Sequence, residues 1–197
     1  TYDAIFHQSG IQRVEGIHEL FHYAEAFSKQ PLPRGNRVAI ITNAGGPGIL
    51  ATDSLERSGL SLARFKNETI STLGQYLPDA ASAANPVDVL GDARADRYKL
   101  ALETVSADPH VDGLMIVLTP QAMTEIEATA DAIGEVANSI NKPVITCFMG
   151  EAMVEPGIER LEGYGIPNYP FPERAAQAFK AMADYRQIQS RPSPEFK

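Results

Sequence analysis

Short, nearly continuous apolar runs alternate along this chain with longer segments of helical periodicity. The clearest runs are residues 38–42, 113–118 and 143–148. Runs of this kind are typical of strands that are covered on both faces of a sheet. Weaker strands are predicted at 60–65 and 166–169. Residues 85–89 are expected to be extended, because a residue that precedes proline avoids helical backbone angles.

Helices are predicted in the segments between and after these strands. Their expected bounds are 47–57, 68–77, 96–106, 125–140, 155–162 and 172–186. Strands that alternate with helices favour a parallel sheet with helices on both faces and right-handed crossovers. The pattern therefore predicts an α/β fold with a flavodoxin-like, doubly wound, five-stranded parallel sheet.

The first 36 residues follow a different pattern. Apolar residues recur there at spacings of three and four, which predicts a helix with one apolar face made of Ile17, Leu20, Phe21, Ala24 and Phe27. Prolines at 31 and 33 end this helix. We expect a helical arm from a preceding domain at 1–36, the flavodoxin-like domain at 37–188, and a polar C-terminal linker at 189–197. Both ends of the chain look cut from a longer protein.

Composition and charge exclude several classes of partner. The 197 residues are 44% hydrophobic and carry a formal net charge of −8. Nucleic acids and membranes are not expected as partners, because both require clustered Lys and Arg. The single cysteine, Cys147, excludes an internal disulfide and fits a reducing, cytoplasmic location. No apolar run approaches the roughly 20 residues of a membrane span.

The turn after the first strand is the strongest candidate for chemistry. Its glycines let a ligand approach the main chain, and Pro47 suits the first position of a helix. We expect the amides of Gly48 and Ile49 to be unpaired at the helix N-terminus, where the helix dipole favours an anion. A plain tight turn, with glycine for close packing, is the alternative. The predicted phosphate-binding residues are Asn43, Ala44, Gly45, Gly46, Pro47, Gly48 and Ile49.

Two other segments are expected at the same edge of the sheet. One is Asn85, Pro86, Val87 and Asp88, where the carboxylate of Asp88 could point into a crevice. The other is Thr119, Pro120 and Gln121, which follow a buried strand. Ordinary loops that satisfy their own backbone are the alternative for both segments.

The histidines and the cysteine offer no clear chemistry. His18 and His22 are four residues apart, but no third metal ligand accompanies them. His7 and His110 lie in a helix-end and a loop context, and Cys147 lies within a buried strand. No Walker sequence follows the glycine-rich turn. We therefore predict an anion site without a catalytic residue or a metal site in this chain.

Several motifs, taken in order, resemble a known family, the NDP-forming (ADP-forming) acyl-CoA synthetases. These include the acetate–CoA ligases and are related to succinyl-CoA synthetase. The resemblance covers essentially the whole chain, which looks like the second flavodoxin-like ligase-CoA domain. It rests on residues 35–48 with Ala-Gly-Gly-Pro-Gly, 85–88 (Asn-Pro-Val-Asp), 111–114 (Val-Asp-Gly-Leu), 142–144 (Lys-Pro-Val) and 3–11 (Asp-Ala-Ile-Phe-His-Gln-Ser-Gly-Ile).

The resemblance implies a role within a larger acid–thiol ligase. Such enzymes use CoA, ATP/ADP and Mg, and combine a CoA-binding Rossmann domain, two ligase domains and an ATP-grasp unit. An acyl phosphate and a phosphohistidine connect acyl-CoA and nucleotide. Residues 43–49 would then face the phosphohistidine, while 85–88 and 119–121 would line the acyl/CoA site. The family's Ser-His-Thr-Gly-like segment would lie upstream of Thr1, so the isolated chain is expected to be inactive.

Two other functions remain open at this stage. A related domain could serve a protein acetyltransferase as a non-catalytic, acyl-CoA-sensing scaffold. An unrelated flavodoxin-like binder is less favoured: a flavin carrier needs hydroxyls in the first loop, where only Thr42 has one. A phospho-receiver needs acidic residues there.

Overall fold

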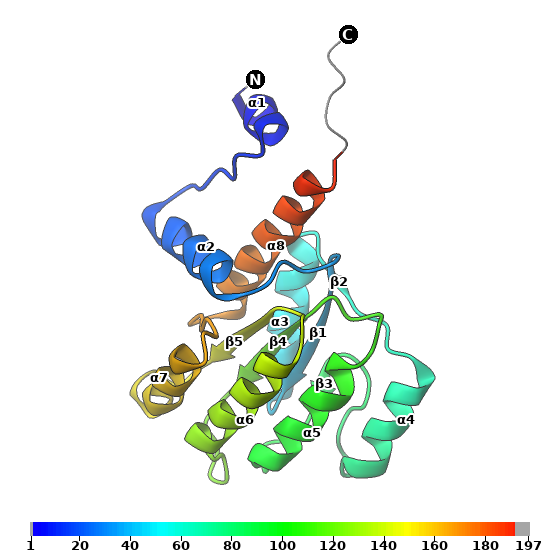
Figure 1. Cartoon of the computed structure of the whole chain (residues 1–197). Coiled ribbons are helices and arrows are strands. Elements are labelled where there is room, and N and C mark those ends of the chain that lie inside the picture. Colours follow the sequence, from blue (N-terminus) through cyan, green and yellow to red (C-terminus); the bar gives the residue numbers. More distant parts are fainter. Residues whose placement is uncertain (1, 192–197) are drawn as a thin grey trace.

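The computed structural model describes residues 2–191 (Figure 1). Most of the predicted linker at 189–197 lies outside these residues, as does the side chain of His7. The elements along the chain are α1 (Tyr2–Ser9), α2 (Ile17–Lys29), β1 (Arg37–Thr42), α3 (Gly45–Arg57), β2 (Ser61–Leu62), α4 (Asn67–Tyr76), β3 (Val87–Asp88), α5 (Ala95–Ser106), β4 (Gly113–Leu118), α6 (Ile126–Ser139), β5 (Val144–Phe148), the short 3-10 helix η1 (Glu151–Met153), α7 (Glu155–Gly163) and α8 (Pro172–Gln189).

The sheet has five parallel strands, as predicted, with β1 at its centre. The order is β2-β1-β4-β5, and β3 pairs with β1 as well. β2 pairs with the start of β1, where Arg37 lies opposite Ser61, and β3 pairs with the end of β1, where Thr42 lies opposite Asp88. β2 and β3 thus share one edge of β1, one after the other.

The identity of the fifth strand differs from the prediction. Residues 166–169 form only an isolated bridge, between Asn168 and Thr146 of β5. The fifth strand is instead β3, which lies in the segment that was expected to be merely extended. The predicted strand 60–65 is also shorter than expected, because β2 leaves the remainder of that edge of β1 to β3.

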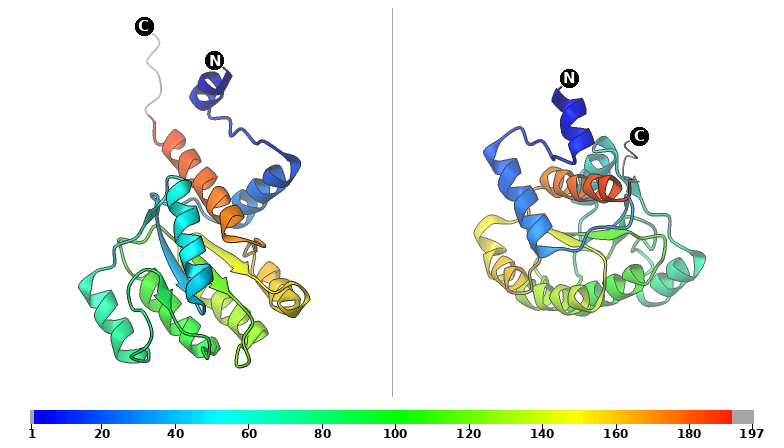
Figure 2. Two further views of the ribbon diagram at one scale, coloured as in Figure 1. Left: turned by 180° about the vertical axis from the view of Figure 1, so that it is seen from behind. Right: turned by 45° about the horizontal axis from the view of Figure 1, so that its top comes forward.

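Helices cover both faces of the sheet. Figure 2 shows α3 and α8 on one face, with α2 outside, and α4 to α7 on the other. The side chains of β1 alternate between the two cores: Val38 and Ile40 pack with α3 and α8, whereas Ala39 and Ile41 pack with the opposite layer. Strands buried on both faces explain the continuous apolar runs in the sequence. None of the helices within 2–191 has the length and apolar character needed to cross a membrane.

The N-terminal arm contains two helices and lies against α8. Gln12 Nε2 donates to the carbonyl oxygen of Ala181 at 3.3 Å, and Ala26 is the residue of α2 that is fully buried. The predicted apolar face of this helix is wrong in part. Phe27 packs into the core, but Ile17 and Phe21 are 61% and 66% exposed. The reason is that α2 contacts one helix rather than a complete layer, so only a narrow stripe of it is covered.

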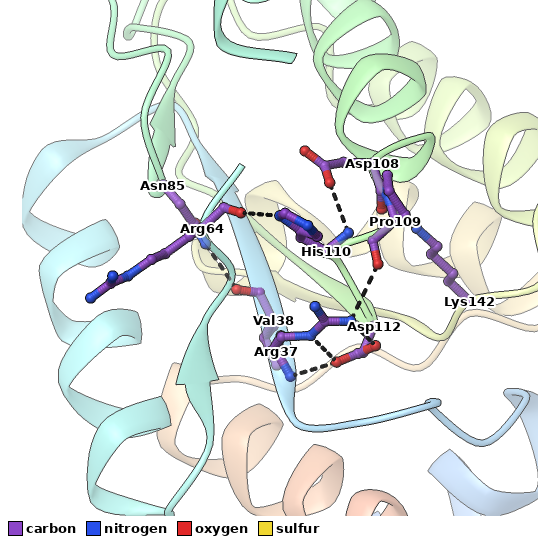
Figure 3. A network of polar contacts seen from close by, with 9 residues as sticks. All are labelled: Arg37, Val38, Arg64, Asn85, Asp108, Pro109, His110, Asp112 and Lys142. Atoms are coloured by element: carbon purple, nitrogen blue, oxygen red, sulfur yellow. Dashed lines mark hydrogen bonds and ion pairs between the residues drawn. The ribbon is translucent and has the colours of Figure 1, made fainter. Parts of the chain in front are cut away.

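The side chain of Asn85 fills the gap between β2 and β3 (Figure 3). Its Oδ1 accepts from the N–H of Ile40 at 2.9 Å, and its Nδ2 donates to the carbonyl oxygens of Val38 and Ala63 at 2.9 and 3.0 Å. The N–H of Ile40 and the carbonyl oxygen of Ala63 would otherwise lack partners, because neither short strand pairs at this level. The carbonyl oxygen of Val38 also accepts from the N–H of Ala63 at 2.9 Å. The side-chain amide of Asn85 therefore makes the hydrogen bonds that a further residue in the gap between β2 and β3 would make.

A second polar anchor lies at the start of β1 (Figure 3). The Arg37 guanidinium donates to both carboxylate oxygens of Asp112 at 2.8 and 2.9 Å, and the Arg37 N–H donates to Oδ2 at 3.1 Å. Burial by itself raises the pKa of Asp112, but these hydrogen bonds outweigh it and hold the pKa below its usual value. The pair fixes the start of β1 to the entrance of β4.

Candidate functional site

The three segments singled out in the sequence lie together at the C-terminal ends of the strands. In the register of the strands, Thr42 lies opposite both Asp88 of β3 and Val117 of β4. The chain therefore leaves β1, β3 and β4 at the same level, toward Gly45, Leu90 and Thr119. β1 and β4 are also where the chain order reverses direction across the sheet, which is where ligands bind in such folds.

Helix α3 begins at Gly45, two residues earlier than predicted. The expectation that Gly48 and Ile49 have unpaired amides is wrong. The N–H of Gly48 donates to the carbonyl oxygen of Ala44 at 3.1 Å, and Ile49 lies one residue further into the helix, where Gly45 supplies its regular acceptor. The helix therefore begins within the predicted turn, and Gly45 and Gly46 are its first residues.

The earlier start moves the free donors to Gly45 and Gly46. The N–H of Ala44 donates to Thr42 Oγ1 at 3.1 Å, and Pro47 has no N–H. Gly45 and Gly46 are exposed and occupy the first two helical positions, where the helix supplies no acceptor. Two adjacent main-chain donors thus remain at the positive end of the helix dipole.

The glycines of this turn serve different purposes. A Cβ on Gly48 would lie 2.9 Å from Thr42 Cγ2, so this glycine permits close packing of α3 on β1. A Cβ on Gly46 would meet nothing within 4 Å. The packing alternative thus holds for Gly48, whereas the openness at Gly46 is compatible with the anion site.

Asn43 is part of the turn but its side chain faces inward. It is 2% exposed, and its Nδ2 donates to the carbonyl oxygen of Thr119 at 2.8 Å while its Oδ1 accepts from the N–H of Thr119 at 2.9 Å. The side chain of Asn43 therefore cannot contact a ligand directly.

The segment 85–88 contributes less than was expected. The amide of Asn85 is used by the sheet, as described above, and the side chain of Val87 is fully buried. Asp88 remains near the turn: its Oδ2 would lie 3.7 Å from a Cβ on Gly45, and its Oδ1 accepts from the N–H of Leu90 at 2.9 Å. Asn85 and Val87 are structural because β3 carries this segment into the sheet.

The segment 119–121 lies across the switch point from α3. Thr119 and Pro120 are half-buried and Gln121 is exposed. Gln121 Nε2 donates to Thr119 Oγ1 at 3.3 Å, and the Gln121 side chain lies beside Gly91 of the β3 exit. The exits of β1, β3 and β4 thus lie beside one another.

Sequence reasoning missed three residues near the C-terminal ends of the strands: Tyr98, Leu90 and Glu151. The hydroxyl of Tyr98 in α5 donates to the carbonyl oxygen of Val117 at 3.1 Å, beneath the switch point. Leu90 and Glu151, which follow β3 and β5, have φ angles of 69° and 48°. Left-handed angles at non-glycine residues often occur beside ligand sites. Neither feature has a signal in the sequence, because helical spacing marks Tyr98 only as core.

His22 and Cys147 are packed among other side chains, as expected of residues with a structural role. The ring of His22 packs edge-on against Tyr169, with centroids 5.2 Å apart, and burial lowers the pKa of His22. Cys147 is fully buried, and burial raises the pKa of its thiol to about 12. A thiol of this kind is a poor nucleophile near neutral pH.

Comparison with known proteins finds a family match over most of the chain. A family model described as Ligase-CoA domain matches residues 38–191. The alpha subunit of the ADP-forming acetate–CoA ligase II of Pyrococcus furiosus is 42% identical over 187 residues, which make up 92% of this chain and 40% of that subunit. The ADP-forming acetate–CoA ligase I of Archaeoglobus fulgidus is 36% identical over 97% of this chain and 27% of that protein.

Solved structures share the fold. Acetyl-coenzyme A synthetase 1 of Ca. Korarchaeum cryptofilum, described as dinucleotide forming, has been solved in its apo form. It matches with a TM-score of 0.89 and 31% identity over 96% of this chain and 42% of that one. The same synthetase in complex with phosphate and ADP also matches with a TM-score of 0.89. The chain thus spans less than half the length of these relatives. It belongs to the Ligase-CoA domain family.

Proposed function

We propose that this chain is the part of an ADP-forming acid–CoA ligase that holds a phosphoryl group at the N-terminus of α3. The carrying observation is the pair of free, exposed N–H groups of Gly45 and Gly46, at the switch point of a Ligase-CoA domain. The phosphoryl group would be carried by a histidine outside this chain, between an acyl phosphate and the nucleotide. CoA, ADP and the remaining ligase domains would be partners in the complete enzyme.

The geometry suits phosphoryl transfer because it needs no reorganisation. The first turn of α3 is held by the contact between Gly48 and Thr42 and by the bonds of Asn43 to Thr119. Donors fixed in this way stabilise charge as it develops, and each well-placed donor contributes about 3 kcal/mol to such a transition state. This chain would therefore supply electrostatic stabilisation, while the nucleophile comes from elsewhere.

The neighbouring residues would line the site where acyl and CoA groups react. These residues are Asp88, beside Gly45, and Thr119, Pro120 and Gln121 at the exit of β4. The carboxylate of Asp88 would repel a bound anion. An anion whose charge is partly neutralised by a partner group would therefore bind better than a free one. Weak binding of free phosphate to the isolated chain is therefore expected.

The proposal can be tested by titrating the ¹⁵N-labelled chain with inorganic phosphate at constant ionic strength. The amide signals of Gly45 and Gly46 should shift in a saturable manner. Gly74 and Gly163, which are exposed glycines in α4 and α7, serve as internal controls and should not shift. Shifts that are equal at all four glycines, or that chloride reproduces, would show that the α3 turn is not a phosphate site.

A matched pair of variants isolates the donor at Gly45. Gly45→Pro removes one N–H, and the preceding residue, Ala44, already has extended angles (φ −147°, ψ 120°) that suit proline. Gly45→Ala adds a similar Cβ but keeps the N–H. The proline variant should bind phosphate about fivefold more weakly, the value of one hydrogen bond, and the alanine variant should bind like the parent. Equal affinities would contradict the proposal.

A further inference from the structure

The carboxamide of Asn43 replaces a peptide group at the point where β1 leaves the sheet. The last backbone pair of β1 and β4 is Thr42 with Val117. Beyond it the backbone of β1 turns into α3, while the Asn43 side chain continues the ladder by bonding both the N–H and the carbonyl oxygen of Thr119. One donor and one acceptor are what a backbone residue would offer there.

This side chain is also the first link of a hydrogen-bonded series that leads from the exit of β1 to the exit of β4. Thr119 Oγ1 lies 3.3 Å from Asn43 Oδ1 and accepts from Gln121 Nε2 at 3.3 Å. A Cβ on Gly91, just after the turn closed by Asp88 and the N–H of Leu90, would lie 3.4 Å from Gln121 Cδ. The hydrogen bonds therefore join the exits of β1 and β4, and the series ends beside the exit of β3.

We propose that Asn43 is a positioning residue that couples the first turn of α3 to residues 119–121. It sets the direction of the Gly45 and Gly46 amides relative to β4. An oxyanion bound at these amides and the conformation of residues 119–121 therefore depend on each other. This inference rests on the proposed function and extends it, because the anion site and the predicted acyl/CoA side would respond together.

The coupling has a direct physical route. Asn43 is buried and adjacent to the N-cap residue Ala44, so an anion that tightens the first turn of α3 in place also tightens the bonds of Asn43 to Thr119. Buried hydrogen bonds of this kind cannot exchange for water without cost, so the two segments respond as one unit. A longer Gln or a donor-free Asp at this position would break the match.

The first measurement uses the unmodified chain and inorganic phosphate. Phosphate should shift the amide signals of Thr119 and Gln121 with the same saturation curve as those of Gly45 and Gly46. It should also slow hydrogen exchange of the Thr119 N–H about fivefold, the scale of one strengthened hydrogen bond. Saturable shifts at the two glycines, without any response at Thr119, would overturn the coupling and leave the proposed function intact. No response at the glycines would refute both.

Variants then separate positioning from general stability. Asn43→Ala should weaken phosphate binding about fivefold to tenfold and abolish the response at Gln121, because it removes both bonds to the Thr119 backbone. Thr119→Val keeps those bonds but removes the hydroxyl that accepts from Gln121 Nε2, so it should keep the phosphate response at the Thr119 N–H and lose the response at Gln121. Thr69→Val removes a buried bond of 2.8 Å to Asp108 at the far edge of the sheet, and controls for loss of stability alone.

The outcomes are distinct even if one variant folds poorly. Should Asn43→Ala not fold, Asn43→Asp keeps the acceptor for the Thr119 N–H and loses the donor, and it should likewise lose the response at Gln121. Parent-like affinity together with a retained Gln121 response in either Asn43 variant would overturn the proposal. So would an equal loss of affinity in Thr69→Val, since that would reduce the effect to stability.

Discussion

Replacement of Asn85 by alanine tests the claim that one side chain completes the sheet. The substitution removes three hydrogen bonds, of 2.9, 2.9 and 3.0 Å, and leaves the N–H of Ile40 and the carbonyl oxygens of Val38 and Ala63 without these partners. At about 1 kcal/mol for each bond, the expected loss in the free energy of unfolding is about 3 kcal/mol. For a chain of this size the corresponding fall in Tm is about 6–12 °C.

The magnitude can be measured by urea unfolding followed by circular dichroism. Ser82→Ala is the control, since its hydroxyl makes only a long contact of 3.5 Å in the same segment, and its effect should stay within about 0.5 kcal/mol. Asn85→Asp sharpens the test. It keeps the acceptor for Ile40 but sets a carboxylate against two carbonyl oxygens, so it should be at least as destabilising at pH 7 and recover partly at low pH.

A loss below about 1 kcal/mol for Asn85→Ala would refute this reasoning, because even the weakest usual value for three such bonds exceeds it. It would mean that water replaces the amide at the gap between β2 and β3. Asn85 would then be free for the ligand-lining role that the sequence suggested.

The remaining predictions concern the turn, the acid response and the thiol. Gly48→Ala should destabilise the chain by about 1–3 kcal/mol, because its Cβ would lie 2.9 Å from Thr42 Cγ2. Gly46→Ala should cost less than about 0.5 kcal/mol, because its Cβ would meet nothing within 4 Å. Thermal unfolding of the two variants compares these effects. Asp112 has a lowered pKa in the folded state, so its share of the stability is present above the unfolded value of about 3.9 and is lost as the pH falls from about 4 toward the folded pKa. Urea unfolding between pH 6 and about 2.5 should therefore show a smaller acid-dependent loss in Asp112→Asn, and equal slopes would contradict the assignment. Cys147, whose thiol pKa is raised to about 12 by burial, should react with a thiol reagent at pH 8 only after unfolding, and rapid native-state labelling would contradict its buried placement.

The sequence was sufficient for the α/β architecture, apart from the identity of the fifth strand, and for placing the candidate segments together at the C-terminal ends of the strands. Continuous apolar runs at 38–42, 113–118 and 143–148 could only be strands buried on both faces, and their alternation with helical segments determined a parallel sheet. Because parallel strands end at one edge, the glycine-rich turn, Asp88 and Thr119 could be placed together without coordinates.

The tertiary structure alone decided which groups are available for chemistry. Whether an amide is free depends on where the helix begins, and three glycines in four residues leave that start undetermined in the sequence. In the structure the helix begins at Gly45 rather than Pro47. Likewise, the amides of Asn43 and Asn85 look the same in the sequence as ligand-binding groups. In the structure, Asn85 bonds backbone groups in the gap between β2 and β3, and Asn43 bonds the backbone of Thr119 where β4 ends beside β1. The sequence could not show this, because hydrogen bonds between distant segments leave no local pattern.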